Sequence, residues 1–256
     1  MEIFDPDKSK SAIDILQLRS SNTELQAPIH SHDKGQLVMP VTGSMMCKVD
    51  DEIWMVPSES AVWIPAGVPH TNTPAASATF CFVFLDSTKV ELPDRCCTLS
   101  ISPLVREIVL YLSTLSAEEL AEDHPTKLVE VLFDLMAKLP REQLNFPLSN
   151  DPRLRKVADT LLSNPADRRT IKEWASFLAM SERTFSRLVA RETGMTFGLW
   201  RKQLHIVVSL QLLTSGFSVQ EASEQLGYES VSAFITMFKK ALGKSPKRYI
   251  QKSSAG

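Results

Sequence analysis

Short apolar runs alternate with turn residues in the first third of the chain, and five of them have the length of a β-strand. The runs are Gln36 to Met39, Ser44 to Val49, Glu52 to Val56, Ala61 to Ile64 and Thr79 to Leu85. Proline, glycine and paired aspartates separate them, which is typical of a small antiparallel β barrel or jelly roll. A weaker alternation before residue 25 predicts one short strand that leads into this domain.

After residue 100 the spacing of apolar residues changes from that of a strand to that of a helix. Between Ser102 and Leu139 apolar residues recur every three to four positions, and the sequence His124-Pro125-Thr126 interrupts them. This pattern predicts an αα-hairpin with a broad apolar face. Such a face can pack on the barrel of the same chain or on a second subunit, and the pattern alone leaves both open.

A polar, proline-marked connector, residues 140–150, separates two parts of opposite charge. The 256-residue chain has a net charge of -2. Residues 151–256 carry 17 Lys and Arg against 9 Asp and Glu, a net of +8 that leaves -10 for residues 1–150. Segregated positive charge indicates a polyanionic partner for the C-terminal part. We therefore expect two domains, with a boundary near Asn150.

One supersecondary pattern occurs twice between Thr170 and Tyr249. The residues Ser181, Phe185, Val189, Gly194 and Thr196 recur in character, 49 positions later, as Ser230, Phe234, Phe238, Gly243 and Ser245. A short helix that opens with a capping box precedes each copy, over Ile171 to Leu178 and Val219 to Leu226. A tight turn and a second helix follow, which is the pattern of a helix-turn-helix unit.

The second helices of the two units are predicted over Glu182 to Thr193 and Val231 to Leu242, and one helix over Phe197 to Thr214 joins the units. The joining helix is about 27 Å long at 1.5 Å per residue. That length suits two recognition helices in successive major grooves, roughly 34 Å apart. The first turn has Ala179 where the second has Gly227, so a positive φ there would carry a cost.

The C-terminal segment GYESVSAFITMFKKALGKSPKRY combines G-Y-x-S, F-x-x-x-F-K and G-x-S-P-x-x-Y elements. With the two helix-turn-helix units, residues 151–250 resemble the DNA-binding domain of the AraC family of transcription regulators. The resemblance implies base contacts from Arg183, Ser186, Arg187, Val231, Ser232, Ile235 and Thr236. We assign Lys239, Lys240, Lys244, Lys247 and Arg248 to phosphates, which set register without reading sequence. Arginine can pair with guanine whereas valine and isoleucine contact only thymine methyls, so specificity should depend on the first unit.

The barrel segment contains the patterns His30-Ser31-His32 and Pro65-Ala66-Gly67-Val68-Pro69-His70. On an extended strand His30 and His32 point to the same face. The segment resembles the cupin family, but Gln36 stands where that family has an acidic ligand. His30, His32, Gln36, Trp63 and His70 are the candidate effector-binding residues. The three histidines are also a candidate site for a divalent metal; the alternative is that they hydrogen-bond within the barrel or contact an organic effector without metal.

The sequence thus predicts an α+β protein with a cupin-like barrel (1–100), an αα-hairpin that forms a dimer contact in the resembled regulators (101–139), a linker (140–150) and a double helix-turn-helix domain (151–256). The expected function is a transcription regulator that binds double-stranded DNA and responds to a small-molecule effector or a metal. We expect a homodimer, with RNA polymerase as a partner if it activates transcription. The alternatives are a cupin metalloenzyme with an appended DNA-binding domain and a nonspecific architectural DNA protein.

Four cysteines without C-x-x-C spacing and the lack of a secretory pattern indicate a reduced, cytoplasmic protein. The adjacent pair Cys96-Cys97 is read as buried or idle thiols, with a redox sensor as the alternative. No apolar run approaches the length of a membrane span.

Overall fold

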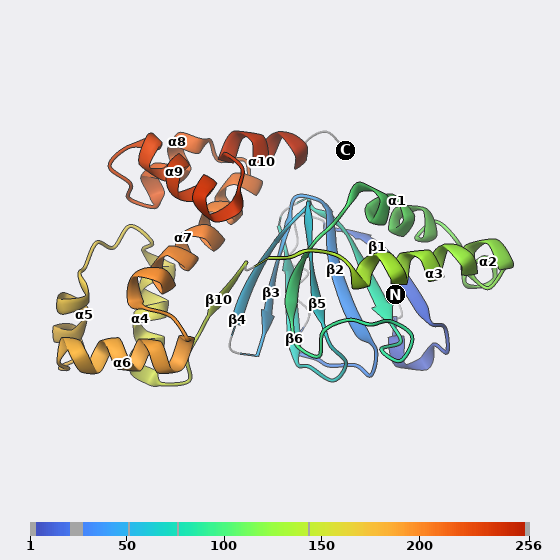
Figure 1. Ribbon diagram of the computed structural model, residues 1–256, viewed down its shortest axis with the longest axis horizontal. Coiled ribbons are helices and arrows are strands. Elements are labelled where there is room, and N and C mark those ends of the chain that lie inside the picture. Colours follow the sequence, from blue (N-terminus) through green and yellow to red (C-terminus); the bar gives the residue numbers. More distant parts are fainter. Residues whose placement is uncertain (1–3, 21–27, 51, 76, 143, 254–256) are drawn as a thin grey trace. The chain divides into compact units, whose positions relative to one another are not determined.

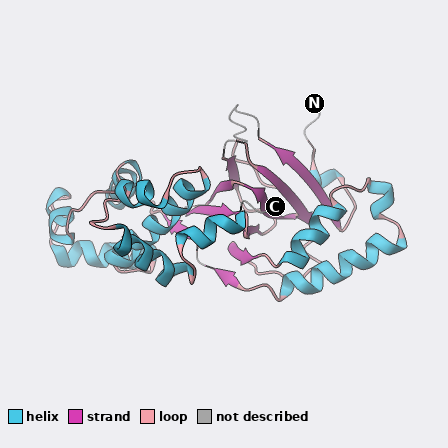
Figure 2. Cartoon of the chain, turned by 90° about the horizontal axis from the view of Figure 1, so that it is seen from above, coloured by secondary structure: helices cyan, strands magenta, loops and turns pink. Residues whose placement is uncertain are grey.

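The computed structural model describes residues 4–20, 28–50, 52–75, 77–142 and 144–253, and the chain forms two compact units. The first unit comprises residues up to 143 apart from 51–55, and the second comprises 51–55 and 144–255. The first is rich in strands and the second is almost entirely helical (Figures 1 and 2). No described helix is both long and apolar enough to cross a membrane.

The strands form two antiparallel sheets. Their bounds are β1 (Ile13–Arg19), β2 (Gly35–Thr42), β3 (Ser44–Val49), β4 (Glu52–Pro57), β5 (Ser60–Ile64), β6 (His70–Pro74), β7 (Thr79–Leu85), β8 (Cys97–Ser100), β9 (Arg141–Glu142) and β10 (Asn145–Pro147). One sheet has the order β1-β7-β2-β5-β8-β9 and the other β10-β4-β3-β6. All five predicted runs are strands, and β1 is the short strand predicted before residue 25. β6 and β8 were missed, because β6 is polar (HTNTP) and β8 has only four residues.

The helices of the αα-hairpin pack on the outer face of the six-stranded sheet. The hairpin and the sheet share one hydrophobic core. The hairpin helices are α1 (Pro103–Leu112) and α3 (Asp123–Ala137), with the short α2 (Ala117–Leu120) between them. Val105, Val109 and Leu132 are fully buried in one cluster with Leu37 and Val83 of the sheet. The broad apolar face of the hairpin therefore packs on its own chain.

The predicted break in the hairpin at His124-Pro125-Thr126 was wrong. Pro125 lies in the first turn of α3, and the chain reverses earlier, through α2. A proline is tolerated in the first turn because the backbone N–H groups there have no partner within the helix.

The second unit contains seven helices in the described part of the chain. They are α4 (Pro152–Ser163), α5 (Ile171–Phe177), α6 (Glu182–Thr193), α7 (Phe197–Thr214), α8 (Val219–Gln225), α9 (Val231–Leu242) and α10 (Pro246–Ser253). Both predicted capping boxes are formed, at the starts of α5 and α8. The turn after α5 places Ala179 at φ 53°, so the first unit does carry the positive φ that glycine provides in the second at Gly227.

The expected linker is partly ordered structure, and residues 144–150 of it belong to the second unit. Phe146 of β10 is fully buried and stacks on Trp200 of α7, with ring centroids 5.0 Å apart. The Trp200 indole Nε1–H donates to the Pro147 carbonyl at 2.8 Å. The polar and proline-rich composition of residues 140–150 concealed these apolar anchors, Leu144, Phe146 and Leu148.

Candidate nucleic-acid interface and histidine cluster

Helix α6 presents two unpaired arginines to solvent. Its amphipathic pattern buries Phe185, Leu188 and Val189. Arg183 and Arg187, four residues apart, therefore lie on one exposed face, with half-buried Ser186 next to Arg187. Neither guanidinium has a hydrogen-bond or ion-pair partner among the described residues. Their donors are thus available to an external acceptor.

Other arginines of this unit are held by carboxylates of the same chain. Arg153 makes a two-atom contact with Asp151, through Nε and Nη2 at 2.9 and 2.6 Å, and these hydrogen bonds lower the pKa of Asp151 to about 2. Arg191 on α6 lies 2.7 Å from Glu192. The contrast separates arginines with an internal partner from Arg183 and Arg187.

Helix α9 presents a face of different chemistry. Val231 and Ile235 are half-buried, while Ser232 and Thr236 are exposed. The Thr236 hydroxyl donates to the Ser232 carbonyl of its own helix at 2.8 Å. The five cations assigned to phosphates follow at its C-terminal end and in α10: Lys239, Lys240, Lys247 and Arg248 are exposed and Lys244 is half-buried. No described acidic side chain lies between residues 231 and 253.

The two helix-turn-helix units meet at the turn before α9. Gly227 has φ +71°, and a Cβ on it would lie 2.9 Å from the Cβ of Ala166, so only glycine allows this approach. His205 of α7 joins the same two segments: its Nε2–H donates to the Pro165 carbonyl at 3.1 Å. Because a carbonyl only accepts, Nδ1 is the acceptor for the Tyr228 hydroxyl at 3.0 Å. The neutral imidazole thereby satisfies both partners.

We expect the chain to lose stability as the pH falls from about 6.5 to 4, and His205 to contribute to that loss. Burial, and then the charges of Arg201 and Arg168, lower the pKa of His205 from 6.5 to about 4. Between these values the unfolded chain binds a proton that the folded chain does not, so acid favours unfolding, by up to about 3 kcal/mol. Urea unfolding at a series of pH values should show a smaller pH dependence for His205→Gln than for the native protein. Equal pH dependence in the two proteins would contradict this prediction.

Three histidines cluster in the first unit. His30 and His70 form an isolated β-bridge, and His32 lies just before β2, so His30 and His32 are not on the regular strand expected. Their ring centroids nevertheless lie 4.5 Å apart for His30 and His70, and 5.1 Å apart for His32 and His70. His32 and His70 are buried and His30 is exposed. One ligand atom from each ring lies within 4.8 Å of the others.

The backbone fixes the same tautomer in all three rings. The Nδ1 atoms of His30, His32 and His70 contact the carbonyl oxygens of Pro28, Lys34 and Val68. A carbonyl only accepts, so each Nδ1 carries the hydrogen and each neutral ring has a lone pair on Nε2. Nε2 of His70 is buried, and no described residue forms a hydrogen bond with it. Burial also lowers the pKa of His70 to about 4, which keeps it neutral near pH 7.

Gln36 lies with the histidines, whereas Trp63 does not. The Gln36 side chain is buried, and its Oε1 lies 3.2 Å from Nε2 of His32. Both atoms are hydrogen-bond acceptors in this arrangement, so they do not bond to each other directly. A cation between them would bind both, and a Gln36 amide turned by 180° would instead donate its N–H to His32. Trp63 pairs with Leu37, the neighbour of Gln36, and so lies on the opposite face of the sheet. There it belongs to the core under the helices, and this corrects its assignment to the effector site.

A comparison with known proteins supports the helix-turn-helix assignment of the second unit. Residues 174–252 match a family model described as a helix-turn-helix domain. The Escherichia coli (strain K12) HTH-type transcriptional regulator NimR is 42% identical over 247 residues, which cover 96% of this chain and 90% of that protein. The Corynebacterium diphtheriae HTH-type transcriptional regulator RipA is 32% identical over 130 residues, 51% of this chain and 37% of that protein.

Two helix-turn-helix units on a strand-rich unit define the class: a DNA-binding transcription regulator. The relatives give the family, and this chain belongs to the AraC family of HTH-type transcriptional regulators. Among solved structures, fatty-acid-bound ToxT from Vibrio cholerae strain SCE256 is 14% identical with a TM-score of 0.39, over 93% of this chain and 94% of that one. The DNA-binding domain of AdpA in complex with target DNA is 29% identical with a TM-score of 0.39, over 41% and 96% of the two chains.

Proposed function

We propose that this regulator reads its operator mainly with α6, and that a ligand bound at the histidine cluster modulates DNA binding. The observation that carries the first part is a pair of guanidinium groups, those of Arg183 and Arg187, on the exposed face of a capped helix, where no described residue pairs with them. Each can donate two parallel hydrogen bonds to O6 and N7 of guanine. Ser186 lies beside Arg187 and completes this reading face.

Helix α9 contributes less to sequence preference in this proposal. Val231 and Ile235 can contact thymine methyl groups, and Ser232 can donate to or accept from a base edge. Thr236 already donates its hydroxyl to its own helix, so only its acceptor and methyl group face the DNA. The lysines and arginine of α9 and α10 bind phosphates and supply salt-dependent affinity.

The histidine cluster suits a divalent metal as the ligand or as part of the ligand site. Metal-binding histidines usually donate the second ring N–H to a backbone carbonyl or a carboxylate, and all three rings here do so. Three imidazoles hold Zn²⁺ or a similar ion, with Nε2 atoms about 2 Å from it. An organic effector that donates hydrogen bonds to the same lone pairs is the alternative.

Further features of the proposal concern assembly and chemistry. Leu104, Tyr111 and Val131 of α1 and α3 are 57%, 45% and 47% exposed, and these apolar side chains support a homodimer through the hairpin. RNA polymerase is a further partner if the protein activates transcription.

We assign the chain no catalytic role, because Gln36 replaces the acidic ligand of metal-dependent cupins and the relatives are named as regulators. A cytoplasmic location accords with a DNA-binding function.

Sequencing of genomic fragments bound by the purified full-length protein tests the regulator proposal. The expected result is enrichment of a few discrete sites that share a sequence, with changed occupancy when Zn²⁺ or another divalent metal is added or chelated. Uniform recovery of the genome would instead identify a nonspecific architectural protein. Discrete sites whose occupancy does not respond to metals would support the proposal that the protein reads DNA. They would also indicate an organic effector rather than a metal.

A further inference from the structure

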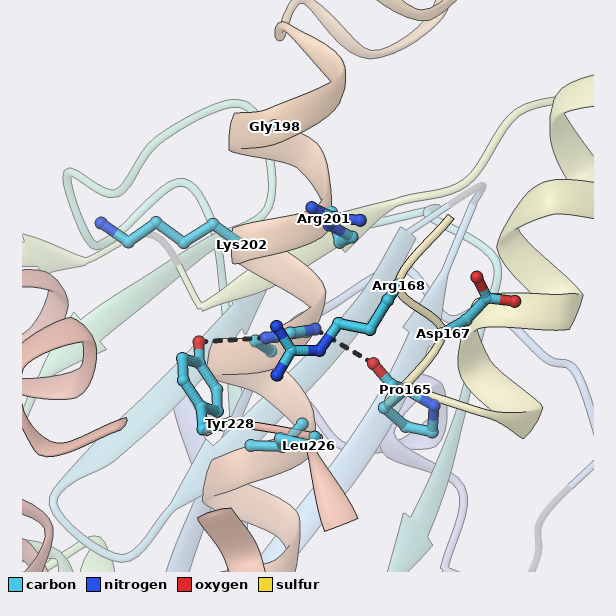
Figure 3. Close-up of a pocket in the computed structure, with 10 residues that line it drawn as sticks. Pro165, Asp167, Arg168, Gly198, Arg201, Lys202, Leu226 and Tyr228 are labelled. Carbon is cyan, nitrogen blue, oxygen red and sulfur yellow. Dashed lines mark hydrogen bonds between the residues drawn. The ribbon is translucent and has the colours of Figure 1, made fainter. Parts of the chain in front are cut away.

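A basic pocket of about 220 Å³ lies where the two helix-turn-helix units meet (Figure 3). Three segments form it: the loop between α4 and α5, one side of α7, and the turn before α9. Its lining includes Arg168, Arg201, Lys202, His205 and Tyr228. A water molecule occupies roughly 30 Å³ of liquid, so the pocket has room for a larger polar group.

The described residues offset the positive charges of the pocket only weakly. Lys202 has no ion-pair or hydrogen-bond partner among the described residues. Arg201 donates to a neutral carbonyl, that of Arg169, at 3.1 Å. The ion pair of Arg168 with Glu229 is 4.0 Å long, and the side chains are 61% and 91% exposed, so solvent screens it strongly.

Asp167 supplies the carboxylate among the described lining residues, and it is directed mainly to another arginine. Asp167 pairs with Arg169, with Nη2 and Oδ2 2.5 Å apart, and its side chain points away from Arg168 in Figure 3. His205 and Tyr228 are hydrogen-bonded to each other and form a fixed wall. Three cations that are at most weakly paired therefore line one small cavity, which is the chemistry of an anion site.

The position of the pocket relates this anion site to DNA. The N-terminal residues of a recognition helix contact base edges, so the turn before that helix lies at the edge of the groove, where the phosphates run. Tyr228 lies in that turn, three residues before α9 begins. A phosphate in the pocket would contact the loop before α5, the joining helix and the second unit's turn at once.

We propose that this pocket binds one phosphate group of the operator backbone through Lys202, Arg168 and Arg201. The inference rests on the DNA-binding function and adds a contact at the joint between the two units, outside the lysine cluster of α9 and α10. The shared chemistry also fits a free phosphate ion or ester, so the experiment distinguishes the two sources.

The test measures the affinity of full-length Lys202→Gln for the operator as a function of salt. Each neutralised phosphate contributes about 0.9 to the slope of log K against log salt, so loss of one contact lowers the slope by about 0.9 and weakens binding about eightfold at ~0.1 M salt. The affinity of Lys202→Gln for unrelated DNA should fall by the same factor as its affinity for the operator, because a phosphate contact carries no sequence information. Arg168→Gln should act in the same direction, and Lys202→Arg should retain most of the native slope.

Neutral methylphosphonates, placed at one operator phosphate at a time, locate the contact. At one position the substitution should weaken the native protein but not Lys202→Gln. Lys127→Gln, on α3 of the other unit, controls for net charge and should leave the slope unchanged. An unchanged slope in Lys202→Gln would overturn the proposal. So would stabilisation of the native protein, but not the variant, by inorganic phosphate without any change in slope. Absence of specific binding by the native protein would instead contradict the regulator proposal.

Discussion

Replacing Arg187 by alanine should weaken binding to the specific site by about 1–3 kcal/mol and relax the preference at one base pair. The guanidinium lies on the exposed face of α6 and has no partner among the residues that the structure describes, so its removal costs the folded protein little. In the complex it would leave guanine O6 and N7 without their donors. Affinities for a set of operators, each altered at one base pair, measure both effects.

Two variants of α6 sharpen this prediction. Arg187→Lys keeps the charge but loses the planar pair of donors, so base preference should relax while the salt dependence stays. Arg191→Ala removes an arginine from the same helix that is already paired with Glu192, and we expect little change in sequence preference. Unaltered preference in Arg187→Ala would mean that another face of α6 reads the bases.

Replacing His32 and His70 by alanine should abolish the ligand response and leave basal DNA binding intact. These two buried side chains belong to the histidine cluster, in which one ligand atom of each ring lies within 4.8 Å of the others, whereas the proposed DNA-binding residues belong to the other unit. If the ligand is a metal, the native protein should bind one ion per chain and the double variant none. Elemental analysis after dialysis and operator titrations with and without Zn²⁺ give both readouts.

His124→Ala is the matched control for the histidine cluster. His124 is exposed in the first turn of α3 and is not part of the cluster. It should bind metal and respond like the native protein. A ligand response that survives in the His32 and His70 variant would show that those histidines are structural. A loss of thermal stability alone, without a change in response, would lead to the same conclusion.

Local sequence signals predicted the helix-turn-helix domain well. The capping boxes, the serine N-caps and the 3.6-residue periods fix helix starts within the chain itself, and the 49-residue offset reports the duplication. The strands of the first unit were predicted less well, because their positions depend on pairing between residues far apart in the sequence. β6 has a polar sequence, and its hydrogen bonds to β3 place His70 beside His30 from far along the chain.

The pocket and the position of Trp63 were beyond local patterns for a related reason. Arg168, Lys202 and Tyr228 belong to three segments, and only the packing around Gly227 and His205 brings them together. The alternation of side chains along β5 shows that Trp63 and Ile64 point to opposite faces of the sheet. Which of these faces carries the histidines depends on the pairing register of β5 with β2. A single strand cannot specify which of its two faces meets the helices.

Base-resolved interference on one isolated operator tests the central claim most directly. Methylation of guanine N7 should block binding at positions in two major-groove segments about one helical turn apart on one face of the duplex. The stronger block should fall in the segment read by α6 and should disappear at one guanine in Arg187→Ala. Interference confined to one segment, or an equal weak effect at every guanine, would contradict a protein that reads DNA with two unequal helix-turn-helix units.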